Sequence, residues 1–200
     1  MAEHDSSETK GYDSLRSRNS MTVAVSGLLA ALSIAIGYSA SFIPRIPGWG
    51  IAYFDPVSFV WMIAFLIGGI RVGMITAAAG TLGLFLFDPF APIGPLMKLA
   101  ATAPMMIVPW VLLWSARLHH DGSNLRSIGR YALYMLFGYL TRLNIMLLLN
   151  LAIIMPLFSL DALTITTIVY VINTTQSILD ATIPYLIVYP TNLFREFRMW

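Results

Sequence analysis

The chain has 200 residues, of which 58% are hydrophobic and 11% are charged, and its mean hydropathy is +0.74. Soluble domains carry about a quarter charged residues, so this composition excludes an ordinary water-facing surface, and it is also unlike disordered or collagen-like chains. The absence of cysteine excludes disulfide frameworks and thiolate metal sites, and a formal net charge of +2 is too small to indicate nucleic-acid binding. The composition therefore predicts an integral membrane protein.

Residues 1–20 are polar and contain both acidic and basic side chains. A secretory signal would begin with a short basic stretch and end its apolar run at a cleavage site, and neither feature is present. We therefore expect a disordered cytoplasmic tail at 1–20, a transmembrane domain at 21–190 and a cytoplasmic C-terminal tail at 191–200.

Apolar segments follow that are long enough to cross a bilayer, which takes roughly 20 residues. The first runs from about Met21 to Ile43. The stretch from Pro56 to Phe87 contains Gly68-Gly69, where we expect a tight turn between two short helices of roughly 17 residues each. The remaining helices are expected at about Leu96–Trp114, Tyr131–Phe158 and Leu163–Val188. The prediction is an all-α integral membrane protein with six transmembrane helices.

The basic residues are divided unequally between the predicted loops. With the N-terminus inside, nine Lys and Arg residues fall on the inner side, and only Arg45 and Lys98 fall on the outer side. Because Lys and Arg favour cytoplasmic loops, we expect both termini in the cytoplasm and a multi-pass protein of the cell (plasma) membrane.

The predicted outer loops, at about 42–55 and 87–95, are rich in proline, and the first contains Trp49 and Tyr53. Such loops either form a lid over a cavity or anchor the chain at the level of the lipid headgroups, where Trp and Tyr are enriched. The sequence leaves both interpretations open.

Motifs for enzymatic chemistry are absent from the sequence. It contains no G-x-x-x-x-G-K-[ST] phosphate loop, no G-x-S-x-G nucleophile elbow and no H-E-x-x-H metal motif. The three histidines, His4, His119 and His120, all lie outside the predicted helices. We therefore expect a protein that is not an enzyme, with no catalytic site, no metal site and no cofactor.

Polar residues inside the last two predicted helices indicate a site. They are Arg142, Asn144 and Asn150 in one helix, and Asn173, Gln176 and Asp180 in the other. Charged groups at the centre of a bilayer are unfavourable, so they usually face a cavity or a partner. The spacing i, i+3, i+7 places the second set on one helix face. The groups form either a binding pocket, which we favour, or a hydrogen-bond network that holds two helices together.

Arg142 and Asp180 are predicted to form an ion pair. Counted from the inner helix ends at about 1.5 Å per residue, they lie roughly 16 Å and 15 Å deep. Mutual neutralisation is the usual solution for buried opposite charges. We expect this pair at the floor of a cavity, with Asn150, Asn173 and Gln176 nearer the outside, facing a ligand.

Gly27, Ala31 and Ala35 are spaced four residues apart in the first predicted helix. Small residues at this spacing let another helix approach closely. The neighbour is either a helix of the same chain, which the spacing alone favours, or a helix of a partner protein.

Together these features resemble the S components of energy-coupling factor (ECF) transporters, the vitamin-capturing subunits of a class of ATP-driven importers. The resemblance covers roughly residues 21–190. It rests on the length, the six helices with both ends inside, Ala31-x-x-x-Ala35, and the run from Asp55-Pro56 through Phe65-Leu66-Ile67-Gly68-Gly69 to Arg71-Val72-Gly73.

The resemblance implies a vitamin pocket near the outer face, made by the outer loops and later helices and capped by the first loop. The implied substrate-binding residues are Trp49, Tyr53, Lys98, Arg142, Asn150, Asn173, Gln176 and Asp180. Riboflavin is the first candidate because flavins are common ligands in the family and Trp49 and Tyr53 can stack on a ring. Thiamine, pantothenate and other vitamin precursors stay open.

The resemblance also implies partners. Gly27, Ala31 and Ala35 would dock on a transmembrane scaffold subunit that two cytoplasmic ATPase subunits drive. The alternative is a small secondary transporter that couples to an ion gradient through Arg142 and Asp180, although such folds often contain internal repeats and we find only a doubled Phe-Asp-Pro. A non-transporting scaffold protein is a third interpretation, which the density of polar groups disfavours.

Overall fold

The computed structural model describes residues 2–40, 55–117, 122–159, 161–193, 197 and 199–200, and side chains from residue 19 onward. Its main helices are α1 (Ala2–Ala40), α2 (Pro56–Leu84), α3 (Ile93–Ser115), α4 (Ile128–Leu149), α5 (Met155–Phe158) and α6 (Ala162–Val188). A 3-10 turn, η1 (Gly122–Leu125), precedes α4, and a π-helical turn, η2 (Asn150–Ile154), joins α4 to α5. The described part of the chain contains no strand, and the all-α prediction is confirmed.

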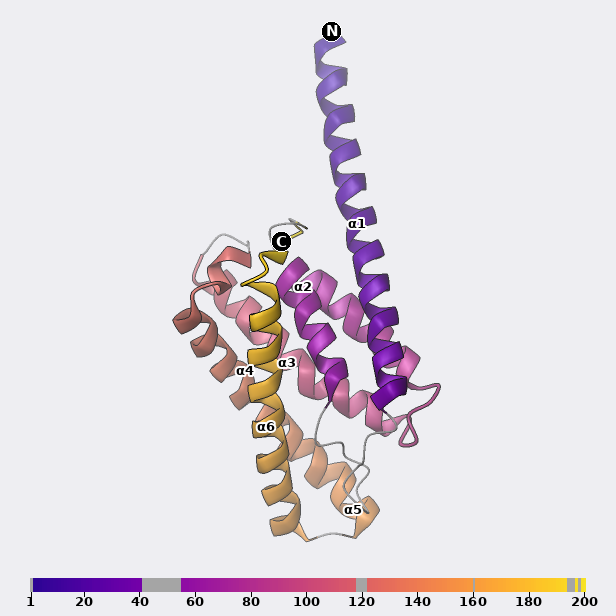
Figure 1. Ribbon diagram of the computed structural model, residues 1–200, viewed down its shortest axis with the longest axis vertical. Helices are drawn as coiled ribbons and strands as arrows, with labels where there is room; N and C mark the ends of the chain where they lie inside the picture. The colour runs from indigo at the N-terminus through magenta and orange to yellow at the C-terminus, as the bar shows by residue number, and fades with distance from the viewer. Residues whose placement is uncertain (1, 41–54, 118–121, 160, 194–196, 198) are drawn as a thin grey trace.

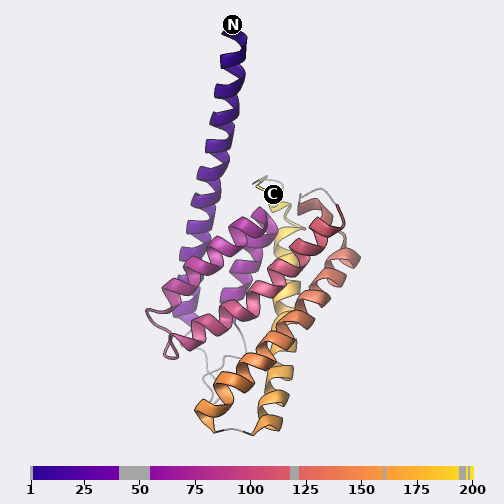
Figure 2. The same cartoon turned by 180° about the vertical axis from the view of Figure 1, so that it is seen from behind.

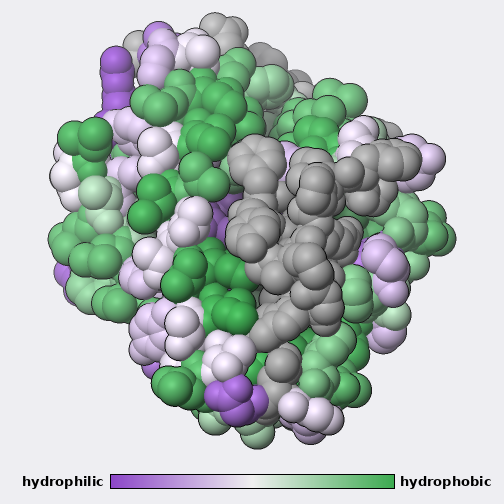
Figure 3. Space-filling view, turned by 60° about the horizontal axis from the view of Figure 1, so that its bottom comes forward, coloured by the Kyte–Doolittle hydropathy of each residue, from purple (hydrophilic) through white to green (hydrophobic). Residues whose placement is uncertain are grey.

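Within the described residues, five helical segments are long and apolar enough to cross a membrane: Asn19–Ala40, Pro56–Leu84, Ile93–Ser115, Ile128–Phe158 and Ala162–Val188. Large hydrophobic side chains, including Leu28, Leu82 and Leu163, are strongly exposed on their outer sides. Among the residues that Figure 3 shows in colour, hydrophobic ones predominate on the flanks. Because water does not tolerate so much exposed apolar surface, the chain is a multi-pass helical membrane protein.

Helix α2 folds back on itself at Gly69. This residue has φ 74° and ψ −169°, a backbone conformation that essentially only glycine adopts. A Cβ atom placed on Gly73 would lie 2.9 Å from Cβ of Phe65, and one on Gly80 would lie 2.7 Å from Nε1 of Trp61. The two arms of α2 therefore run antiparallel and in contact, as Figures 1 and 2 show. The predicted glycine turn is confirmed.

The length of these arms bears on the number of spans. Each arm, 56–68 and 70–84, is roughly 20 Å long at 1.5 Å per residue, whereas the hydrocarbon core of a bilayer is about 30 Å thick. Among the described residues, five helices are long and apolar enough to cross a membrane when each is counted end to end, and one of them, α2, is a hairpin of two shorter arms. Six complete spans stay a prediction.

Both ends of the chain lie at the same end of the bundle, which we call the terminal end (Figure 1). The opposite end, where α1 ends and where α2, α3 and α6 begin, is the loop end. At the terminal end the Trp200 ring would contact a Cβ atom on either Gly69 or Gly122, so the turns that carry Arg71 and Arg126 gather there. Arg71 and Arg126, which the sequence predicts on the inner side of the membrane, thus lie at the same end of the molecule.

The N-terminal part of the chain differs from our expectation. We expected a disordered tail at 1–20, but α1 continues through residues 2–20 and extends beyond the bundle (Figure 1). No proline interrupts this stretch, and a helix that has already formed adds one hydrogen bond for each residue that joins it. The apolar part of α1 packs on α2 through Ser26, Ala30 and Ser33, which are buried.

The core lies between the arms of α2 and the helices α3, α4 and α6. Trp61, Phe65 and Met105 are fully buried within it. A smaller apolar cluster, centred on Leu143, Met146 and Val169, lies between α4 and α6. This second cluster packs together the two helices that carry most of the polar residues of interest.

Candidate functional site

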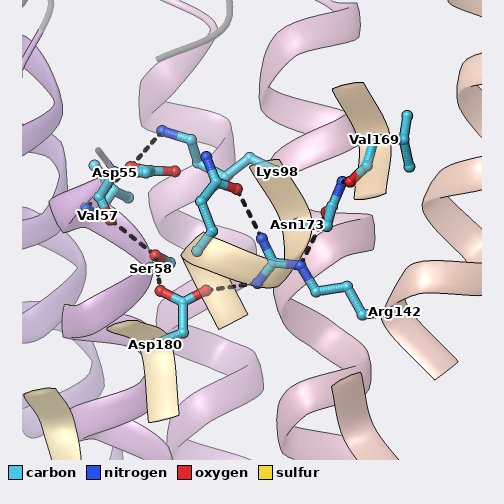
Figure 4. A network of polar contacts seen from close by, with 9 residues as sticks. Asp55, Val57, Ser58, Lys98, Arg142, Val169, Asn173 and Asp180 are labelled. Carbon is cyan, nitrogen blue, oxygen red and sulfur yellow. Dashed lines mark hydrogen bonds and ion pairs between the residues drawn. The ribbon is translucent and has the colours of Figure 1, made fainter. Parts of the chain in front are cut away.

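Arg142 and Asp180 form a buried ion pair between α4 and α6. An η nitrogen of Arg142 lies 2.6 Å from Oδ2 of Asp180, and the two side chains are 2% and 1% exposed. Arg142 also donates from Nε to Asn173 at 3.1 Å and from its other η nitrogen to Gln176 at 2.8 Å. The hydroxyl of Ser58, in the first turn of α2, donates to the second carboxylate oxygen of Asp180 at 2.5 Å. The predicted pair is confirmed, and Figure 4 shows it at the centre of the network.

Arg142 also sets the orientation of the amides around it. A guanidinium group can only donate hydrogen bonds, so the side-chain oxygens of Asn173 and Gln176 must face it. The amide nitrogen of Asn173 then points to α6 itself and donates to the backbone oxygen of Val169 at 2.9 Å. All three guanidinium nitrogens therefore have acceptors, which is the condition under which a buried ion pair is tolerated.

A second ion pair, Lys98–Asp55, lies at the loop end. Nζ of Lys98 is 3.0 Å from Oδ1 of Asp55, and the side chains are 21% and 15% exposed. Asp55 also caps α2, because its Oδ1 accepts from the backbone N–H of Val57 at 3.1 Å, and Pro56 follows as the first helical residue. Asp55 and Pro56 thus start α2, and Asp55 also holds α3 against it through Lys98.

A cavity of about 340 Å³ lies at the loop end, between α3, α4 with its π-helical extension, and α6. Its walls are mostly apolar and include Met97, Ile154 and Ile172. Its polar lining residues are Asp55, Asp88, Lys98, Asn150, Asn173 and Gln176. Mostly apolar cavities with a few placed polar groups are typical of small-molecule sites.

The structure brings half of the predicted substrate-binding residues together at this cavity: Lys98, Asn150, Asn173 and Gln176. Arg142 and Asp180 lie behind Asn173 and Gln176 and do not line the cavity themselves. Trp49 and Tyr53 lie outside the described residues. Contact of any of these side chains with a ligand stays a prediction.

Three members of the site, Asp55, Ser58 and Asp88, were not among the predicted binding residues. Ser58 belongs to an uninterrupted apolar helix, where a serine carries no signal of its own, yet it bonds to Asp180 across 122 residues of sequence. Asp88 is the middle residue of the second Phe-Asp-Pro, at 87–89, a pattern that marks a helix or loop boundary and not a ligand site. It accepts from the backbone N–H of Phe90 at 2.8 Å and lines the cavity. The described residues form no cluster of three or more His, Asp or Glu that could hold a metal ion.

The small-residue row of α1 lies on the outside of the molecule. Gly27, Ala31 and Ala35 are exposed, and a Cβ atom on Gly27 would meet no described atom within 4 Å. The face of α1 that packs within the chain is the neighbouring one, with Ser26 and Ser33. Contact with a helix of the same chain, which the spacing alone favoured, is therefore wrong, because the packing of α1 on α2 turns the row outward.

Comparisons with known proteins do not assign this chain to a family. No family model, curated protein or solved structure matches it. The sequence and the structure together identify the chain as a multi-pass, all-helical membrane protein with a mostly apolar cavity, lined also by a few polar groups, at one end of the bundle.

Proposed function

We propose that this protein is the substrate-binding subunit of an ECF-type importer, which captures a water-soluble vitamin at the outer face of the cell membrane for ATP-driven uptake. The observation that carries the proposal is the cavity of about 340 Å³ at the loop end. Small-molecule sites span about 300–1,000 Å³, so a ligand of vitamin size suits this volume. The mixture of apolar walls with a few amide and charged groups suits a ligand that has both a ring and polar substituents.

The position of the cavity supports capture from outside. It lies at the end opposite the termini, whereas the turns with Arg71 and Arg126 lie at the terminal end. Since basic residues favour the cytoplasm, the cavity faces the outer side. The sequence has no phosphate loop, so the energy for release inward would come from partner ATPases.

The outward row of small residues supports docking on a transmembrane scaffold subunit. We expect Ala31→Trp and Ala35→Trp to block assembly with co-expressed scaffold and ATPase subunits by steric bulk, while ligand binding persists. Leu28→Trp is the control, because Leu28 is 71% exposed on the same helix and is already large. Normal assembly and uptake with both Ala variants would show that this face contacts lipid only.

Purification from cells, followed by mass spectrometry of any co-purified small molecule, tests the function itself. A tightly bound vitamin, together with uptake that requires the ATPase subunits, is the expected result. Riboflavin is the first ligand to test on sequence grounds, followed by thiamine and pantothenate. Uptake without ATPase partners that depends strictly on an ion gradient would replace the proposal with the secondary transporter.

One observation weighs against that alternative. Both carboxylate oxygens of Asp180 are bonded, to Arg142 and to Ser58. An ion-coupling carboxylate needs access to the transported ion, and this one does not line the cavity. We therefore assign the buried pair a structural role beneath the site.

A further inference from the structure

Asn150 is a buried side chain with an unused hydrogen-bond acceptor. It is 5% exposed, lines the cavity and begins the π-helical turn η2. Its amide nitrogen donates to the backbone oxygen of Met146 at 2.7 Å. Because a carbonyl can only accept, the nitrogen must be on that side and Oδ1 on the other. Among the described residues Oδ1 has no hydrogen-bond partner. It is not one of the inaccessible side-chain atoms without a partner, so a ligand in the cavity can reach it. Single π-helical turns within α-helices also occur frequently at functional sites.

The charges near this end of the cavity are already neutralised within the chain. Arg142 directs its guanidinium nitrogens at Asp180, Asn173 and Gln176, so it offers no free positive group to a ligand. The amides that separate it from the cavity are uncharged. The amide nitrogen of Asn173 has two hydrogens, of which the bond to Val169 uses one. The lining of the cavity thus includes an amide oxygen of Asn150 and an amide nitrogen of Asn173 that each retain hydrogen-bonding capacity.

We propose that the cavity takes a ligand whose buried end is uncharged and carries a hydrogen-bond donor beside an acceptor, as in a primary amide, a lactam or a urea-like ring edge. The donor binds Oδ1 of Asn150, and the acceptor binds the amide nitrogen of Asn173. A carboxylate or phosphate between these two amides is disfavoured, because the cations nearby, Arg142 and Lys98, are already paired with Asp180 and Asp55. This inference rests on the proposed function only in that the cavity binds a small molecule.

Three probes with one ring system test the charge requirement: indole-3-acetamide is neutral, indole-3-acetate is an anion and tryptamine is a cation. Binding is measured by isothermal titration calorimetry on dialysed protein in nanodiscs, with empty nanodiscs to subtract partition into lipid. We expect indole-3-acetamide to bind more tightly than indole-3-acetate by about tenfold or more, since a buried charge without a partner is strongly disfavoured.

Asn144 provides a matched control for Asn150. It lies on the same helix and makes the same local bond, from its amide nitrogen to Leu140 at 2.8 Å, but it is exposed and does not line the cavity. Asn150→Leu should weaken indole-3-acetamide binding about tenfold, because the amide donor loses its acceptor, whereas Asn144→Leu should leave it unchanged. Asn150→Asp keeps the shape and adds a negative charge, so it should move the preference to tryptamine. Thermal unfolding checks that each variant is folded. If Asn150→Leu does not fold, the probe preference of Asn150→Asp tests the inference instead.

The outcomes separate this inference from the proposed function. Equal or tighter binding of indole-3-acetate, or equal losses in the two Leu variants, would overturn the inference and leave a ligand-binding cavity. Unchanged probe preference in Asn150→Asp would overturn it as well. If no probe binds the wild-type protein and no small molecule co-purifies, both the inference and the proposed function fail.

Discussion

The contribution of the Arg142–Asp180 pair can be measured with a double-mutant cycle of Arg142→Met and Asp180→Leu. The charged groups are 2.6 Å apart, and both side chains are almost inaccessible. Breaking one partner of such a pair costs about 3–5 kcal/mol, because it leaves an uncompensated buried charge. For a chain of this size that corresponds to a Tm lower by roughly 6–20 °C. Replacing both charges removes the uncompensated group, so the double variant should recover part of the loss.

The two single variants should differ. A guanidinium cannot lose its proton in a protein, so in Asp180→Leu the buried positive charge would keep only neutral acceptors from Asn173 and Gln176. In Arg142→Met the carboxyl group keeps Ser58 and can become neutral by taking up a proton. We therefore expect the larger loss of stability in Asp180→Leu.

The assay is thermal unfolding of the purified variants in nanodiscs. The Lys98–Asp55 pair supplies a control cycle, with Lys98→Met and Asp55→Asn, since Asn retains the ability to cap α2. The side chains of that pair are 21% and 15% exposed. Its coupling free energy should therefore fall near the range that is typical of accessible pairs, about 0.2–1 kcal/mol. Additive effects in the Arg142–Asp180 cycle, within about 0.5 kcal/mol, would refute the reasoning.

Two further predictions concern topology and the hairpin. Reporter fusions after Trp200 and within 118–128 should both report a cytoplasmic location, and an external signal from either would contradict the assigned orientation. Gly69→Ala should destabilise the protein by about 1–3 kcal/mol in thermal unfolding because of its backbone conformation alone, since the nearest atom to a Cβ there is 3.5 Å away. Gly27→Ala, at an open position of a regular helix, should instead stabilise the protein by roughly 0.5–1 kcal/mol. Equal effects of the two substitutions on stability would show that the turn at Gly69 does not require glycine.

Much of the architecture was predictable because it depends on properties local in sequence. The last helix was expected at about Leu163–Val188 and runs over Ala162–Val188, since a hydrophobic run sets the extent of a membrane helix directly. The turn at Gly69 was predictable for the same reason, because a paired glycine within a long apolar run marks a break. The equal depth of Arg142 and Asp180 followed from counting residues along two helices.

The tertiary structure alone decided which groups face one another. Spacing places Asn173 and Gln176 on one face of α6 with Asp180, but only the packing of α4 against that face turns their oxygens toward Arg142. Spacing also identifies a small-residue row on α1 without showing whether it points inward or outward. Contacts such as Lys98–Asp55 join residues 43 positions apart, and helix periodicity constrains only neighbours within a turn or two. The sequence by itself therefore determined the class, the helices and the depth of the charges, whereas the cavity and the free oxygen of Asn150 depend on how the helices pack.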